Sequence, residues 1–384
     1  MSYKQTILFV LIVITPAWGQ EAKPNFPAVL PGRGLAQHDF FYAGEAKSQD
    51  MYIVRRGKIA WEFHDPAGKG EISDARLLSN GNVLFAHQFG VTLIDRNKKV
   101  LWNYDAPAAT EIHTAQMIGK DKVLYVQNGD PAKVVVVNIV TGKTEREFVV
   151  PVKNPKSVHG HFRHARLTDA GTLLVAHMDL SKVVEYDSSG KDLWSHSPGA
   201  QTWSAERLKN GNTLIAGARL VREVNAAGAT VWEFTPADVP DYLFNSMQIA
   251  KRLPNGNTLI NTWFNQWNGT ADPATAPVQA LEVTPDKKIV WALRAWRNPD
   301  LGPSTTIRSD LVPEEIDPTS GSVYQRSERT DPRRGKHRAR SQLTHTGRPA
   351  QYSRPVTQAL RGRLETAQSR EDPAPIADRR ARAQ

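Results

Sequence analysis

Short apolar runs alternate with polar turns from about residue 40 to residue 296. The runs at 84–86 and 214–216 each follow an Asn-Gly pair, which favours a tight β-hairpin because both of its residues accept positive φ. A second apolar run comes next, as at 91–94, and a charged or glycine turn then leads to a run that contains a tryptophan. This order predicts four short strands per unit and no helix.

Two landmarks show that the unit repeats. The first is a turn of the form L-x-N-G-N-x-L, whose glycine or its substitute falls at Gly81, Asp121, Gly171, Gly211 and Gly256. The second is a G-x-x-x-W segment about twenty residues later, with Arg146 in place of the aromatic residue once. Steps of 40, 50, 40 and 45 residues are typical of β-propeller blades, which stack because one blade cannot bury both of its faces. A single β-sandwich, the alternative, does not explain so regular a period.

The number of blades follows from the ends of the repeat. Five units have all four strands, whereas Trp61 is preceded only by the apolar segments at 40–43 and 51–54. We therefore predict an all-β propeller over residues 39–307 with six blades. The N-terminus would supply the outer strands of the closing blade, and residues around 302–307 would supply its inner strand.

The N-terminal segment has the organisation of a secretory signal peptide at residues 1–19. Lys4 precedes a short apolar stretch at 7–15, and the small residues Ala17 and Gly19 stand before Gln20. The apolar stretch is too short for a comfortable membrane span, and a retained anchor is the alternative. We expect a periplasmic or secreted protein, with a Pro/Gly-rich linker at 20–38 and no stable membrane span.

The composition changes near residue 308. Residues 308–384 contain 15 Arg, one Lys and 10 acidic residues, and supply +6 of the net charge of +10. This tail has no Trp, no Phe and no periodicity, which predicts disorder. A reading-frame shift near Ile307 is a second explanation. The Arg-rich stretch at 333–340 is suited to nucleic acid or anionic polymers, but an exported protein rarely meets nucleic acid, so we expect no specific nucleic-acid site.

Candidate functional residues gather in one set of loops. The turns between the first and second strands of each unit are tight, whereas the connections on the opposite face are long and contain eight of the nine histidines outside the tail. Function on repeat scaffolds usually occupies one loop-bearing face. The repeat register places three candidate catalytic residues at the start of the innermost strands, which line the channel: His113, Arg163 and His164. The candidate ligand-binding residues are His87, His161, His177, Trp203, Tyr242, Asn245 and Trp263.

Several kinds of chemistry are disfavoured. The chain has no cysteine, so it carries no disulfide, lipoprotein anchor or thiolate metal site. His159 and His161 have the spacing of a metal pair but no third ligand at a defined spacing, so we assign no metal site from the sequence. The phosphate loop G-x-G-x-x-G, the G-x-S-x-G elbow and H-E-x-x-H are absent.

Two motifs carry a family resemblance over about residues 40–296. The strand ends GKDLWSH (190–196) and GATVWEF (228–234) resemble the tryptophan-docking repeat of quinoprotein (PQQ-like) β-propellers. The turn LPNGNTL (253–259) resembles that of bacterial arylsulfotransferase-type propellers. The resemblance implies an exported propeller of six to eight blades. The second family implies a histidine nucleophile, for which His113 and His164 are candidates, with Arg163 as a further transferase group. Quinoprotein dehydrogenases of the first type use a vicinal Cys pair, which this chain lacks.

The sequence therefore leaves three functional hypotheses. The first is an exported, monomeric propeller that binds a small molecule, carbohydrate or protein on its His/Trp-rich face, because aromatic side chains favour sugars, aryl compounds and peptides. The second is an arylsulfotransferase-like transferase, or a lyase, with a histidine of the channel mouth as base or nucleophile. The third and least favoured is a quinone-dependent oxidoreductase. No cofactor is identified by the residues themselves.

Overall fold

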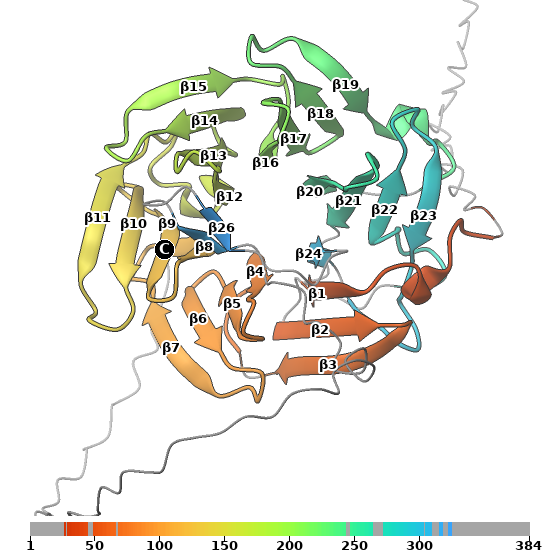
Figure 1. The fold of residues 1–384 in the computed structure, drawn as a ribbon, viewed down its shortest axis with the longest axis horizontal. Helices are drawn as coiled ribbons and strands as arrows, with labels where there is room; N and C mark the ends of the chain where they lie inside the picture. Colours follow the sequence, from red (N-terminus) through yellow and green to blue (C-terminus); the bar gives the residue numbers. More distant parts are fainter. Residues whose placement is uncertain are drawn as a thin grey trace, which may run out of the picture. The chain divides into compact units, whose positions relative to one another are not determined.

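The chain forms a ring of six four-stranded antiparallel sheets around a central channel (Figure 1), as the repeat predicted. The structure is a computed structural model, and it describes residues 27, 29–44, 49–66, 68–242, 246–263, 272–302, 304–308, 315–317 and 322–324. The predicted signal peptide at 1–19 and most of the 308–384 tail lie outside these residues. Within the described part of the chain, no helix has the length and apolar character needed to cross a bilayer.

Each blade runs outward from an inner strand at the channel to an outer strand at the rim. Blade 1 comprises β24 (Ser304–Arg308), β1 (Phe40–Gly44), β2 (Gln49–Arg55) and β3 (Lys58–Asp65). Blade 2 comprises β4 (Asp74–Leu77), β5 (Val83–Ala86), β6 (Gly90–Ile94) and β7 (Val100–Asp105). Blade 3 comprises β8 (Glu111–Ile118), β9 (Lys122–Asn128), β10 (Lys133–Asn138) and β11 (Thr144–Val149).

The remaining three blades follow in chain order. Blade 4 comprises β12 (Phe162–Leu167), β13 (Leu173–His177), β14 (Lys182–Tyr186) and β15 (Asp192–His196). Blade 5 comprises β16 (Thr202–Arg207), β17 (Thr213–Gly217), β18 (Leu220–Val224) and β19 (Thr230–Phe234). Blade 6 comprises β20 (Ser246–Arg252), β21 (Thr258–Trp263), β22 (Ala280–Val283) and β23 (Ile289–Leu293). Three single-turn 3₁₀ helices complete the ring: η1 (Gly34–Ala36), η2 (Val158–Gly160) and η3 (Pro236–Asp238).

The two ends of the repeat close the ring, as predicted. β24 pairs antiparallel with β1, with Tyr42 opposite Ile307, so one blade combines strands from both ends of the propeller. The Tyr42 hydroxyl donates a hydrogen bond of 2.6 Å to the Gly302 carbonyl. Part of the predicted linker also belongs to this closure, because η1 packs on blade 6 and the Gly34 carbonyl accepts a 2.8 Å hydrogen bond from the Trp291 indole.

The repeated tryptophans join neighbouring blades. The indole N–H of Trp61 donates to the Arg96 carbonyl in the next blade at 2.8 Å. Trp194 and Trp232 repeat this contact with Ala226 and Pro285, at 3.1 and 2.9 Å. Each acceptor carbonyl lies in the turn between the third and fourth strands of the following blade. The tryptophan of the G-x-x-x-W landmark therefore anchors one blade to the next by an indole-to-carbonyl hydrogen bond.

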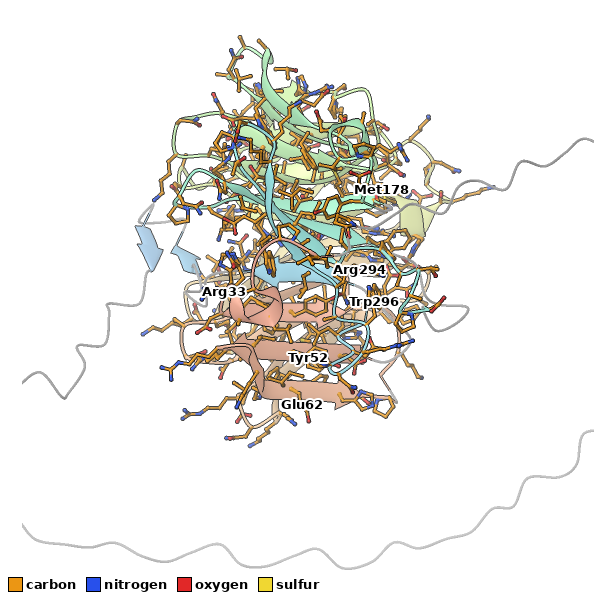
Figure 2. The ribbon with its side chains drawn as sticks, turned by 90° about the vertical axis from the view of Figure 1, so that its right-hand side faces the viewer. Arg33, Tyr52, Glu62, Met178, Arg294 and Trp296 are labelled. Carbon is orange, nitrogen blue, oxygen red and sulfur yellow. The ribbon has the colours of Figure 1, made fainter. Side chains whose placement is uncertain are left out.

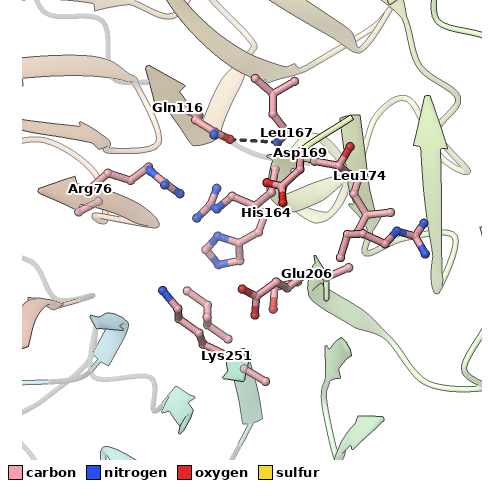
Figure 3. Close-up of a pocket in the computed structure, with 16 residues that line it drawn as sticks. Arg76, Gln116, His164, Leu167, Asp169, Leu174, Glu206 and Lys251 are labelled. Carbon is pink, nitrogen blue, oxygen red and sulfur yellow. Dashed lines mark hydrogen bonds between the residues drawn. The ribbon is translucent and has the colours of Figure 1, made fainter. Parts of the chain in front are cut away.

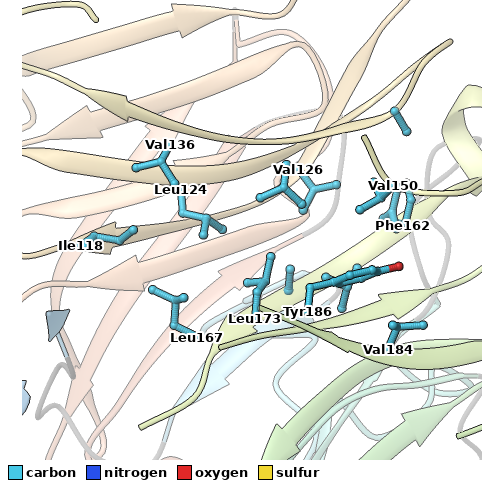
Figure 4. Packing of buried hydrophobic residues seen from close by; sticks show 14 residues of the cluster. Ile118, Leu124, Val126, Val136, Val150, Phe162, Leu167, Leu173, Val184 and Tyr186 are labelled. Atoms are coloured by element: carbon cyan, nitrogen blue, oxygen red, sulfur yellow. The ribbon is translucent and has the colours of Figure 1, made fainter. Parts of the chain in front are cut away.

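Apolar side chains fill the space between blades (Figure 4). Leu124, Val126 and Val136 of blade 3 pack in one cluster with Leu173 and Tyr186 of blade 4. All five are less than a tenth exposed, and burial of a side chain of this size stabilises a fold by about 1.5–3 kcal/mol. The hydrophobic core therefore lies between neighbouring sheets, and each part of it is built by two blades.

The Asn-Gly turns differ in type from the prediction. Gly81 has a φ of 86°, but Asn80 does not have a positive φ. The Gly81 N–H donates to Leu78 O and the Leu78 N–H donates to Asn82 O, the pattern of a type I turn followed by a left-handed glycine. Asn80 acts instead through its side chain, whose oxygen accepts the Asn82 N–H at 2.9 Å. The prediction that both turn residues take positive φ is therefore wrong.

The connections define two faces of the ring. We call the side with the long connections the loop face and the side with the first-to-second strand turns the turn face. Figure 2 shows Met178, Arg294 and Trp296 toward the loop face, and Arg33 on the other side of the ring. On the turn face the structure adds two short strands from the predicted tail, β25 (Glu315–Asp317) and β26 (Ser322–Tyr324). β25 pairs with the last residue of β8, Ile118.

Candidate functional site

A β-bulge recurs near the start of the inner strands, at the end of the channel nearer the loop face. We call this position the bulge level. In β8 the pairing skips from Ile112 to Ala115, and in β12 it skips from Phe162 to Ala165. The residues at the corresponding bulges are His113 and Thr114, Arg163 and His164, Trp203, and Gln248. A bulge re-aims side chains and is common beside functional sites. The fold therefore brings all three predicted catalytic residues to one level.

Glu111 organises the histidines of this level. One carboxylate oxygen, Oε2, lies 2.7 Å from His113 Nε2 and 2.8 Å from His159 Nδ1. Burial of the Glu111 carboxyl opposes ionisation, but the hydrogen bonds from His113 and His159 outweigh it and hold the pKa of Glu111 well below its ordinary value. On its other side, His113 Nδ1 lies 2.7 Å from Ser73 Oγ and 3.4 Å from Glu71 Oε1. His113 is fully buried, whereas the His159 side chain is 53% exposed.

Arg163 lies between this histidine cluster and two tryptophans, Trp203 and Trp263. Its guanidinium donates to His159 Nε2 at 2.8 Å and to the His159 carbonyl at 2.5 Å, and lies 5.7 Å from the centre of the Trp203 ring. Trp203 in turn lies 5.9 Å from Trp263. The indole nitrogens of both tryptophans are buried and have no hydrogen-bond partner among the described residues. Two of the predicted ligand-binding residues therefore lie beside a predicted catalytic one.

A buried ion pair lies below this level. The Asp74 carboxylate accepts two hydrogen bonds from the Arg166 guanidinium, at 2.8 and 2.7 Å, and one from the Thr114 hydroxyl at 2.9 Å. Burial of the Asp74 carboxyl opposes ionisation, but the charge of Arg166, the neighbouring imidazole of His164 and the hydrogen bonds of Arg166 depress the pKa of Asp74 far below its ordinary value. These contacts join the inner strands of blades 2, 3 and 4.

His164, which is only 1% exposed, lies beside this ion pair. Neither of its ring nitrogens has a hydrogen-bond partner among the described residues, and Nδ1 lies 3.9 Å from Asp74 Oδ1. Burial lowers the pKa of His164, so its ring is neutral at physiological pH. A buried polar group without a partner costs about 1–3 kcal/mol and calls for an explanation.

His164 faces a cavity in the channel (Figure 3). The cavity has a volume of about 140 Å³, well above what one water molecule needs. Arg76, His164, Glu206 and Lys251 come from four different blades and point toward one another across it. The charged residues of the lining are four basic and two acidic: Arg76, Arg166, Arg207, Lys251, Asp169 and Glu206. Arg166 is paired with Asp74 and Arg207 with Glu185, so the lining carries charges of both signs, with Arg76 and Lys251 as the basic residues outside these two pairs.

The other predicted ligand-binding residues do not join the channel cluster. His177 is buried on β13 and bonds the Tyr186 hydroxyl at 2.8 Å, and burial lowers its pKa to about 3. His161 bonds the Asn154 carbonyl at 2.8 Å, and His87 bonds the Thr92 hydroxyl at 3.1 Å. Tyr242 packs against the apolar cluster between blades 5 and 6. Asn245 lies outside the described residues.

The sequence analysis missed the carboxylates that hold the site together: Glu71, Asp74 and Glu111. One signal was present. His113, Arg163, Trp203 and Gln248 each stand eight residues before the turn landmark of their unit, as Ser73 does. Polar or aromatic residues at this position in every unit mark the bulge level. Each missed carboxylate lies within two residues of it.

Comparison with known proteins supports the fold alone. No protein-family model matches the chain, and none of the curated proteins matches it significantly. A solved protein of unknown function from Bacteroides caccae is 23% identical, with a TM-score of 0.60 over 70% of this chain and 98% of that protein. Streptogramin B lyase is 11% identical (TM-score 0.46, 74% and 89% covered), and the WD40 propeller domain of Doa1 is 15% identical (0.45, 58% and 72% covered). None of these likenesses assigns an activity to this chain.

Proposed function

We propose that the protein binds a small anionic molecule inside the central channel of its propeller. The observation that carries the proposal is the imidazole of His164, which is buried beside the cavity with both ring nitrogens unpartnered. A neutral imidazole offers one donor and one acceptor, so a ligand with an anionic oxygen and a hydroxyl is able to satisfy both. The predicted export remains part of this proposal. The cavity lies toward the turn-face ends of the inner strands, so a ligand or partner on the loop face remains a separate prediction from the sequence.

The charge and size of the cavity define the ligand class. Arg76 and Lys251 point toward His164 across the cavity (Figure 3), and a guanidinium or ammonium group is a strong hydrogen-bond donor to an oxyanion such as a carboxylate, sulfate or phosphate. Leu167, Leu174 and Ile249 add apolar surface, which suits a short organic portion. A cavity of about 140 Å³ is small for a peptide or an oligosaccharide, so those ligands from the sequence hypotheses fit it less well.

Thermal unfolding in the presence of anions tests the proposal. Sulfate, phosphate, short carboxylates and an aryl sulfate are compared with chloride at matched ionic strength, for the wild type, His164→Phe and His64→Ala. We expect one class of anion to raise the Tm of the wild type and of His64→Ala, whose histidine is exposed on blade 1, as its concentration passes the Kd. His164→Phe should lose at least ten-fold in affinity. Because neither ring nitrogen of His164 has a hydrogen-bond partner among the described residues and Nδ1 lies 3.9 Å from Asp74 Oδ1, this variant should fold with a Tm close to that of the wild type without anion. Equal anion effects in all three proteins contradict the proposal.

A second candidate is the arylsulfotransferase-like transferase, and one observation favours His164 over His113 as its nucleophile. Both nitrogens of His113 lie at hydrogen-bond distance from carboxylate or hydroxyl oxygens, whereas those of His164 are unpartnered and its ring is neutral. In such a transfer the sulfuryl group would leave a phenol oxygen, bond to the imidazole nitrogen, and then pass to an acceptor phenol. Release of p-nitrophenol from its sulfate ester, dependent on an acceptor and on His164, would support this function. Anion binding without release would restrict the protein to binding.

A further inference from the structure

The loop-face end of the channel carries a second feature that the proposed anion site does not use. Glu71, His113 and His159 each offer one ligand atom, and these three atoms all lie within 4.8 Å of one another. Glu71 precedes β4, His113 lies on β8, and His159 lies in η2, so the group forms only when blades 2, 3 and 4 pack together. We infer that these three side chains bind a divalent transition-metal ion, with Zn²⁺ as the best match.

The hydrogen bonds to Glu111 determine which nitrogen of each imidazole is able to bind a metal ion. A carboxylate only accepts, so the nitrogens that face Glu111, His113 Nε2 and His159 Nδ1, carry the hydrogens. In this tautomer the opposite nitrogen of each ring is the lone-pair acceptor. These acceptors, His113 Nδ1 and His159 Nε2, lie 3.4 and 4.0 Å from the same Glu71 oxygen. A carboxylate behind each ligating histidine is the usual support of a metal site, and its loss typically costs 10–100-fold in affinity.

The ligand set and the spacing suit zinc. Two histidines and one glutamate are a known catalytic zinc set, which leaves a fourth position for water or a ligand oxygen. Bonds of about 2.0–2.1 Å in a tetrahedral site place ligand atoms about 3.3 Å apart. The distances of 3.4 and 4.0 Å to Glu71 are close to this value. An ion at the site displaces the Ser73 hydroxyl, 2.7 Å from His113 Nδ1, and the Arg163 guanidinium, 2.8 Å from His159 Nε2. His159 is 53% exposed, which gives an ion a route to the buried His113.

Arg163 competes with an ion at His159 Nε2, as the Ser73 hydroxyl does at His113 Nδ1. Its guanidinium donates to His159 Nε2 at 2.8 Å and lies 3.8 Å from Glu71 Oε1, where it opposes a second cation by charge and by position. The Trp203 ring, 5.7 Å from the guanidinium carbon, offers it an alternative contact when an ion displaces it. Removal of Arg163 should therefore strengthen metal binding, a direction that a purely structural cluster does not predict.

Calorimetric titration of the whole protein with ZnCl₂ in a non-chelating buffer tests the inference. We expect one ion per chain in the wild type, at least ten-fold weaker binding in His159→Ala and in Glu111→Gln, and several-fold tighter binding in Arg163→Met. His64→Ala, an exposed histidine beside Asp50, is the matched control and should bind as the wild type does. Because His159 is exposed, its variant should keep the fold, which circular dichroism checks.

Two outcomes would overturn the inference. One is the absence of a one-to-one site in both the wild type and Arg163→Met. The other is zinc binding that His159→Ala leaves unchanged, which would assign the ion to surface histidines. The visible spectrum of bound Co²⁺ gives a second readout, because its intensity separates a tetrahedral site from loose octahedral binding. The anion test at His164 uses different residues, so either proposal can fail alone.

Discussion

Replacement of Trp291 by Ala should lower the free energy of unfolding by about 3–5 kcal/mol, the range for a fully buried large aromatic residue. Trp291 is 1% exposed, packs with Phe40 in the cluster that closes the ring, and donates its indole hydrogen to Gly34. A Cβ on Gly32, whose φ is 85°, would meet the Trp291 ring at 2.6 Å, so the N-terminal segment lies directly on the indole. The substitution therefore creates a cavity and also removes a contact that holds the N-terminal segment on blade 6. Urea unfolding followed by far-UV circular dichroism gives the measurement.

Trp194→Ala is the matched control for this experiment. Trp194 occupies the same repeat position and donates to Ala226, but its ring is only partly buried. We expect a loss of about 1–2 kcal/mol, from one hydrogen bond and partial burial. Equal losses for the two variants would show that docking between blades, and not closure of the ring, accounts for the effect.

The contrast between these tryptophans shows what local sequence does and does not specify. The turn glycines and the tryptophans are local features at a fixed spacing, so they were sufficient to predict the blades, their number and the strand exchange between β24 and β1. The sequence could not distinguish Trp291 from the others, because its burial depends on residues 29–38, which look like a linker when considered alone. The Asn80-Gly81 turn shows the same limit, since the dipeptide is compatible with more than one hairpin turn.

The candidate site was predicted only as far as the repeat register extends. His113, Arg163 and His164 were placed at the channel because each stands at a fixed distance from a turn landmark. Their partners follow no such rule: Asp74 and Arg166 are 92 residues apart, and Glu111 contacts His159 across 48. Which carboxylate meets which base is decided by the packing of neighbouring blades. A single sequence does not specify which carboxylate pairs with which base, so this network could be identified only from the structure.

That network makes Asp74 the position where one polar substitution should cost most. Asp74→Ala removes the carboxylate that accepts from the Arg166 guanidinium and the Thr114 hydroxyl at the junction of three inner strands, and leaves the Ala165 carbonyl as an acceptor at 2.8 and 3.4 Å. Loss of one partner of a buried pair costs about 3–5 kcal/mol, and we expect the lower end because Arg166 is 23% exposed and keeps some water. Urea unfolding at pH 7 measures the loss. Asp286→Asn, an exposed aspartate paired with Lys288 at 2.9 Å, should leave stability nearly unchanged.

The pH dependence of the Tm distinguishes the contribution of the Asp74 charge from that of its packing. Because the pKa of Asp74 is lower in the folded chain than in the unfolded one, ionisation stabilises the fold in full above the unfolded value of about 4, and this stabilisation is lost progressively as the pH falls from there toward the lower folded-state pKa. Asp74→Asn has the same size and no charge, so its Tm should lie well below that of the wild type at pH 7. The difference between the two Tm values should shrink as the pH is lowered from 5 toward 2. A difference that stays constant over this range would mean that packing around the side chain, and not the ion pair with Arg166, stabilises the junction of blades 2, 3 and 4.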